Sequence, residues 1–133
     1  MKKKLSLLNL VRYLLRTVLV VGIILFFEKK NLQSGFEIIQ ILPAKIFTPN
    51  NDGWNDYLEI QYSNLNDALV SGKIFDLKGG LVAYMEKDTT KEILKWDGKD
   101  TQGRMSPGGV YIYQIEISGS ENKVINGTVI LAR

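Results

Sequence analysis

The chain has 133 residues, 45% of them hydrophobic, which suits one modest domain with a packed core. It has no cysteine and no histidine, so thiol nucleophiles, disulfides, histidine general bases and the usual zinc sites are excluded. Residues 1–30 hold seven basic residues and one acidic residue, a balance of +6, whereas residues 31–133 hold 10 and 13, a balance of −3. The C-terminal part has no basic stripe, which argues against nucleic-acid binding.

The N-terminal segment begins with basic residues and continues as an apolar run. Lysines occupy positions 2–4, and the stretch from Thr17 to Phe27 has the length of a signal-peptide core. Counted from Leu5, the segment would form a helix of about 35 Å at ~1.5 Å per residue. We predict a hydrophobic helix in residues 1–30, either a cleaved signal peptide or an inner-membrane anchor through residues 5–27. Both interpretations export the rest of the chain, and a buried amphipathic helix of a soluble protein is the weaker alternative.

From Phe36 onward the sequence predicts strands separated by turns. Short β-rich runs alternate with Gly, Asn, Asp and Pro, and no stretch has a helical period. We expect an all-β fold, an Ig-like antiparallel β-sandwich of about seven strands. The absence of βαβ alternation argues against a parallel sheet. Residues 31–43 are expected to be a linker and lead-in, and residues 44–133 the domain. The predicted strands are residues 36–47, 57–63, 70–77, 81–85, 92–96, 109–118 and 123–132.

The stretch FTPNNDGWND, residues 47–56, permits two interpretations. Oxygen-bearing side chains suit calcium, but the spacing of an EF-hand loop is not met. In the favoured interpretation the stretch is an ordered turn, with Pro49 fixing φ, Gly53 taking positive φ and Asp56 bonding the amides of the following strand. The calcium ligands in the other interpretation would be Asn50, Asp52, Asn55 and Asp56.

Two further stretches raise the question of carbohydrate chemistry. Asp97 and Asp100 would suit the paired carboxylates of a glycoside hydrolase, but no other feature indicates a cleft. We favour Trp96 as a core residue, followed by a tight turn at Asp97 and Gly98. The aromatic strand that begins at Val110 is interpreted as sandwich core rather than a sugar-stacking platform. The sequence therefore predicts no enzyme, no cofactor and no small-molecule substrate.

Four stretches in order resemble the gliding motility-associated C-terminal domain, which is the type B sorting domain of the type IX secretion system. The first, FTPNNDGWND, is similar to the family's FTPNGDGxND opening, although Asn51 and Trp54 depart from its usual glycine and small apolar residue. The others are KIFDLKGGLV (73–82), WDGKDTQGRMSPGGVYIYQI (96–115) and the terminal NGTVILAR. The Ig-like domain of the flagellar hook-capping protein shares the second and third stretches but lacks the opening, and the terminal LAR also favours the sorting domain.

The resemblance implies a non-enzymatic exported domain that acts as a C-terminal sorting signal, with the secretion machinery as partner. It implies a cell-surface or secreted location if the N-terminal segment is cleaved, and otherwise an anchored protein facing the periplasm. The alternative is a membrane-tethered structural or adhesive Ig-like module, with calcium or carbohydrate binding as a weaker option. The implied sorting residues are Thr48, Pro49, Asn50, Asp52, Gly53, Asn55, Asp56, Trp96, Asp97, Gly98, Gly127, Thr128 and Arg133.

Overall fold

The structure is a computed structural model that describes residues 9, 11–18, 35–88 and 90–133. The chain divides into two compact units, Met1–Ser34 and Gly35–Arg133. In the first unit residues 11–18 are helical and exposed, and the Thr17 hydroxyl donates to the Leu14 carbonyl at 2.8 Å. No helix among the described residues is long and apolar enough to cross a membrane. The predicted hydrophobic helix is thus seen only as this short piece, and residues 19–27 of its apolar stretch lie outside the described residues.

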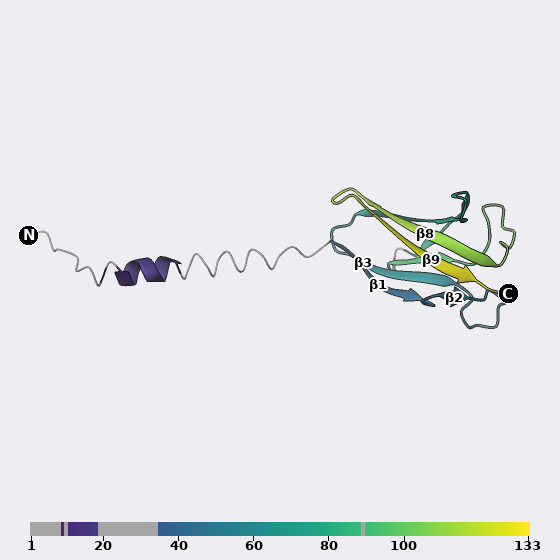
Figure 1. Cartoon of the computed structure of the whole chain (residues 1–133), viewed down its shortest axis with the longest axis horizontal. Helices are drawn as coiled ribbons and strands as arrows, with labels where there is room; N and C mark the ends of the chain where they lie inside the picture. Colours follow the sequence, from purple (N-terminus) through teal and green to yellow (C-terminus); the bar gives the residue numbers. More distant parts are fainter. Residues whose placement is uncertain (1–8, 10, 19–34, 89) are drawn as a thin grey trace, which may run out of the picture. The chain divides into compact units, whose positions relative to one another are not determined.

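The second unit is a sandwich of two sheets, which confirms the all-β prediction (Figure 1). One sheet has four strands in the order β1-β3-β7-β6, and the other has five in the order β2-β9-β8-β4-β5. The strands are β1 (Phe36–Leu42), β2 (Ile46–Phe47), β3 (Leu58–Asn64), β4 (Leu69–Phe75), β5 (Leu81–Tyr84), β6 (Glu86–Asp88), β7 (Ile93–Trp96), β8 (Gly109–Ser118) and β9 (Lys123–Leu131).

The described residues form nine strands rather than about seven, for two local reasons. The expected strand 36–47 is divided at Pro43, which has no backbone N–H to donate, and the chain crosses there from one sheet to the other. The other addition is β6, whose three charged residues give no apolar alternation from which a strand is predicted. Because the chain does not reverse direction at the crossing, β2 pairs with β9 in parallel, which corrects the expectation of purely antiparallel sheets.

The core lies between the two sheets and follows the predicted alternation. In β3, Leu58, Ile60 and Tyr62 are buried while their neighbours are half-buried. In β8, Tyr111 and Tyr113 are 6% and 8% exposed. Each fully buried large apolar side chain contributes roughly 1.5–3 kcal/mol. The aromatic strand is therefore core, as predicted, and its tyrosines do not form an exposed sugar-stacking surface.

Gly127 has a packing role in this core. It lies directly opposite Tyr113 in the β8–β9 pair. A Cβ atom added at Gly127 would overlap the Tyr113 ring and hydroxyl. The bulky tyrosine thus fills the space that glycine leaves, which explains why a residue without a side chain stands in the middle of a long strand.

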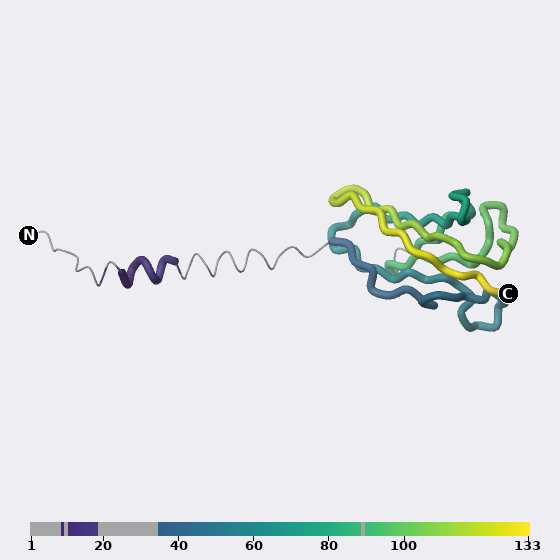
Figure 2. Tube along the Cα trace, in the orientation of Figure 1, coloured from purple at the N-terminus to yellow at the C-terminus, as the bar shows by residue number. Residues whose placement is uncertain are grey.

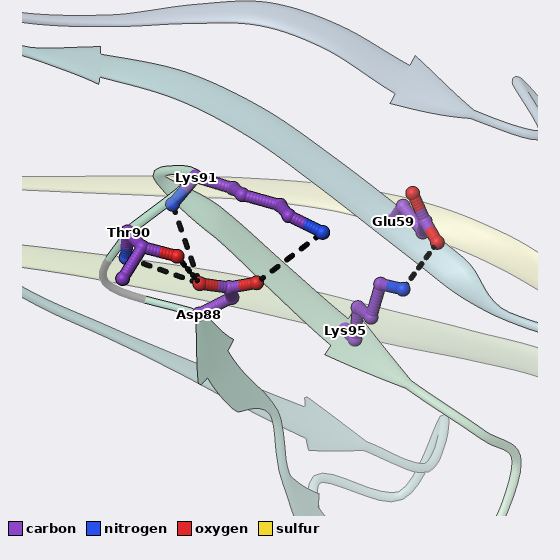
Figure 3. A network of polar contacts seen from close by, with 5 residues as sticks. All are labelled: Glu59, Asp88, Thr90, Lys91 and Lys95. Atoms are coloured by element: carbon purple, nitrogen blue, oxygen red, sulfur yellow. Dashed lines mark hydrogen bonds and ion pairs between the residues drawn. The ribbon is translucent and has the colours of Figure 1, made fainter.

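The outer face of the four-stranded sheet carries charged pairs (Figure 3). Glu59 and Lys95 are cross-strand partners with 2.8 Å between their charged atoms, and this hydrogen bond raises the pKa of Lys95. Asp88 accepts bonds from the Thr90 hydroxyl at 2.7 Å and the Lys91 amide at 3.3 Å, which fixes the turn between β6 and β7. Water screens such exposed contacts, so they orient this hairpin more than they stabilise it.

Candidate functional site

The loop between β2 and β3 folds around the carboxylate of Asp56. One oxygen, Oδ1, accepts the backbone amides of Asn50 at 3.1 Å and Asn51 at 2.7 Å, and Oδ2 accepts that of Gly53 at 2.9 Å. Asp56 is only 8% exposed. The predicted ordered turn is present, but its closure differs from the expectation. The carboxylate reaches back into the loop and not forward onto the following strand, because it must serve amides left unpaired by the turn.

A second ring of hydrogen bonds orders the outer part of the loop. The Asn50 side-chain oxygen accepts the Asp52 amide at 3.0 Å, and its NH₂ group donates to Asp52 Oδ2 at 2.8 Å. Asp52 Oδ1 in turn accepts the Trp54 amide at 2.8 Å. The bond from Asn50 is the main cause that lowers the pKa of Asp52. Asn and Asp thus act here through their short side chains bonding nearby backbone.

Positive φ angles explain the other residue choices in this loop. Gly53 has φ of 88°, and Asn51 and Asn55 have φ of 62° and 54°. Asparagine tolerates this left-handed conformation better than other side chains, so Asn51 can stand where the family has glycine. Trp54 points into solvent at 78% exposure, so its bulk meets no neighbour that would reject it.

The proposed calcium ligands are engaged inside the loop. Both oxygens of Asp56 and both of Asp52 accept hydrogen bonds, and Asn55 contributes its backbone carbonyl to the Thr48 amide at 2.8 Å. Among the described residues, no group of three or more acidic, cysteine or histidine side chains could hold a metal ion. Calcium binding by this loop remains a prediction without a preformed cage to support it.

The turn after β7 packs against this loop. Trp96 is 2% exposed, and its indole lies 5.2 Å from Phe47 and 5.1 Å from Tyr111 between ring centroids. Its Nε1 donates to the Lys99 carbonyl at 2.8 Å. Gly98 has φ of 81° and is tightly enclosed, because an added Cβ atom would lie 3.0 Å from the Pro49 ring and 3.1 Å from Leu131. Trp96 is therefore a core residue, as predicted, and Gly98 is required by space as well as by φ.

The chain terminus completes this end of the sandwich. The Ala132 amide donates to the Phe47 carbonyl at 3.0 Å, and Arg133 Nη2 donates to the Ser106 carbonyl at 2.6 Å. The Ser106 amide donates to the Gly98 carbonyl at 2.9 Å. Figures 1 and 2 show the loop after β2 and the C-terminus at the same end of the unit. We call this assembly of residues 48–56, 96–98 and 131–133 the motif end.

Most of the predicted sorting residues belong to the motif end, and two do not. Gly127 and Thr128 lie within β9 and pair with Tyr113 and Ile112 of β8. They act in the sheet, at a distance along the strand from the terminal Arg133.

Residues 41–131 match the model of the CHU_C type IX secretion signal domain. The chain belongs to this family. The match confirms the resemblance to a type IX sorting domain that the four sequence motifs indicated. A search of curated proteins finds no match.

Three solved structures are similar to this chain in fold. Latent dimeric PorU from Porphyromonas gingivalis has a TM-score of 0.50 and 18% identity, over 72% of this chain and 9% of that one. PorZ from the same organism, described as an essential bacterial surface component of the type IX secretion system, has a TM-score of 0.45 and 23% identity, over 68% of this chain and 11% of that one. CopC from Methylosinus trichosporium OB3b has a TM-score of 0.46 and 14% identity, over 72% and 92%. The CHU_C chain thus spans about a tenth of PorU or PorZ, and the likeness is one of fold alone.

Asp97 and Asp100 of the CHU_C domain are both ion-paired. Asp97 bonds the amide and the ammonium group of Lys99, at 3.0 and 2.7 Å. Asp100 accepts two bonds from the Arg104 guanidinium, at 3.0 and 2.9 Å. Burial acts to raise the pKa of Asp97 but the bonds from Lys99 outweigh it, and the backbone bond from Arg104 is the main cause that lowers the pKa of Asp100. A glycosidase general acid needs a raised pKa, so the pair does not fit that chemistry.

The lowered pKa values of Asp52, Asp97 and Asp100 predict acid sensitivity. Each carboxylate binds its proton less tightly when folded, so its stabilisation is present above the ordinary value of 3.8 and is lost as pH falls through the folded pKa. We expect the midpoint temperature of thermal unfolding to decrease as the pH is lowered below about 4. In the Asp100→Asn variant this decrease should be less steep. Calorimetry across pH 2–7 measures this, and an equally steep fall in that variant would contradict it.

Sequence reasoning missed the backbone groups that join the motifs. Ser106 and Phe47 link the turns and the terminus through their main-chain atoms. Such bonds require no particular side chain, so the sequence does not reveal them.

Proposed function

We propose that this protein is exported and that its CHU_C domain is a non-enzymatic sorting signal, read by the type IX secretion machinery for delivery to the cell surface. The observation that carries the proposal is the match of residues 41–131 to the type IX secretion signal family. The motif end supports it, because close packing and hydrogen bonds bring the opening and closing motifs of the domain together on one surface.

We propose further that the sandwich is of the Ig-like type. Its first strand divides between the sheets, and the second half pairs in parallel with the last strand. The Tyr111 hydroxyl donates to the Pro107 carbonyl at 2.6 Å, four residues upstream near the start of β8. A tyrosine bonded back to the backbone at this place is typical of Ig folds.

Residues 1–30 would supply the first step of export in this proposal. Their basic start and apolar run suit a signal peptide, or alternatively an inner-membrane anchor through residues 5–27. The mass of the mature protein at the cell surface, measured by mass spectrometry, shows whether the N-terminal segment has been removed. It therefore distinguishes a cleaved signal peptide from a retained anchor. A retained segment on protein confined to the periplasm would favour the tethered Ig-like module instead.

Secretion of a reporter tests the sorting function. Residues 35–133 would be fused to the C-terminus of a reporter with a standard signal peptide, in a bacterium with an intact type IX translocon. We expect the reporter outside the cell, and in the periplasm of a translocon-deficient strain, which is the matched control. A fusion that is protease-resistant, hence folded, but periplasmic in both strains would overturn the proposed function.

A further inference from the structure

Three of the four edges of the sandwich are protected against pairing with another strand. The register of β1 with β3 shifts at a bulge between Ile38 and Gln40. β6 consists of the three charged residues Glu86–Asp88. β5 has four residues, and its Val82 carbonyl accepts the Thr101 amide at 2.9 Å from a crossing loop. Bulges, charges, short strands and covering loops are the usual means of blunting a sheet edge.

The fourth edge lies along β9 (Figure 1), and none of the described residues forms a bulge or a covering loop there. All nine residues of β9 pair with β8 without a register shift, and β2 covers only its last two. The Ile130 amide points away from β8, since it donates to the Lys45 carbonyl at 2.8 Å. Strand alternation then directs the backbone N–H and C=O groups of Val124, Asn126 and Thr128 to the same side. No strand in the described part of the chain pairs with them.

Half-buried apolar side chains lie on the same side of the sandwich. The connection 43–45 joins β1 to β2, so the edges of β1 and β9 are neighbours. Ile38 and Ile41 of β1 and Ile125 of β9 pack against the core without being fully buried. A strand added beside β9 would place alternate side chains inward, where they would cover this apolar margin.

We propose that residues 124–128 of β9 bind an extended strand of a partner protein, which joins the five-stranded sheet in line with β2. The backbone groups would give the affinity, and inward apolar side chains at alternate positions of the partner strand would give the specificity. The identity of the partner, a protein of the type IX machinery, rests on the proposed function.

A second copy of this chain fits the edge poorly. Antiparallel pairing of two β9 strands centred on Asn126 would set Asn122 of one copy opposite Ile130 of the other, where β2 already lies. A register shifted away from β2 would leave fewer residues paired. A partner strand that has a free end, or that belongs to an open loop, can end before it reaches β2. The β9 strand of a second copy cannot, because it continues into the hairpin with β8.

The first experiment uses the full chain in a bacterium with the type IX system. Asn126→Pro removes one outward N–H and leaves the bonds to β8, because proline is tolerated at a free strand edge. Asn126→Ala is the matched control, since it changes the side chain and keeps the N–H. We expect Asn126→Pro to keep its thermal midpoint within a few degrees and to be secreted about tenfold less, whereas Asn126→Ala is secreted normally. Normal secretion of folded Asn126→Pro would overturn the proposal; if it unfolds, Val124→Pro replaces it, with Val124→Ala as its control.

The second experiment does not depend on secretion. A photo-crosslinking amino acid would replace Thr128 on β9 or, as control, Ser71 on β4, two strands away. We expect irradiated cells to give an adduct with an identified translocon component from position 128 and none from 71. An adduct with a second copy, or no adduct at 128, would overturn the strand-binding proposal even where the protein is secreted. If position 128 gives the expected adduct but the cells do not secrete the protein, the sorting function would be rejected and the strand-binding proposal would stand.

Discussion

Replacing Trp96 with alanine is expected to lower the unfolding free energy by about 3–5 kcal/mol, the usual result of deleting a large buried aromatic side chain. The indole is 2% exposed and contacts both Phe47 and Tyr111. Its loss leaves a cavity beneath the motif end, where the β2 strand and the terminus meet. Urea unfolding followed by circular dichroism measures the change.

The protein contains its own matched control for this substitution. Trp54 is 78% exposed, so Trp54→Ala is expected to change stability by no more than about 0.5 kcal/mol. Trp96→Phe separates the two roles of the indole, since it keeps most of the packing but leaves the Lys99 carbonyl without its donor. We expect a loss between those of the other two variants. Equal losses for Trp54→Ala and Trp96→Ala would contradict the assignment of Trp96 as the core residue.

The sandwich could be predicted because its central strands alternate strictly. Tyr111 to Ile117 in β8 bury every second residue, and such a period of two survives whatever the tertiary context. The parallel pairing of β2 could not be predicted, because two residues carry no period and the crossing at Pro43 is decided by packing between sheets.

The turns of the candidate site could be predicted from the sequence, but the contacts between its separate segments could not. Gly53 marked a position of positive φ and Gly98 a tight turn, and both glycines have positive φ. The close approach of Gly98 to Pro49 joins positions far apart in the chain, so no local pattern announces it. The direction in which Asp56 bonds depends on which loop amides the turn leaves unpaired, and this is a property of the folded backbone.

Asp56→Ala is expected to lower the unfolding free energy by about 3 kcal/mol, because three loop amides would lose the acceptor that this carboxylate, only 8% exposed, provides. Asp56→Asn should lose less, since its single oxygen still accepts from one side while its NH₂ group opposes the Gly53 amide. Asp52→Ala, in the exposed part of the loop, should lose least. Urea unfolding of the three variants gives this order.

The same variants decide between a self-contained turn and a calcium loop. If the Asp56 carboxylate binds only the loop amides, the unfolding midpoint of the wild-type chain is the same with calcium as with a chelator. The loss of stability in Asp56→Ala is then also the same under the two conditions. A wild-type midpoint that rises with calcium, and no longer does so in Asp56→Ala, would make the loop a metal site. The first result would mean that the loop keeps the same hydrogen bonds to the Asp56 carboxylate before and after export, whatever the calcium concentration on either side of the membrane.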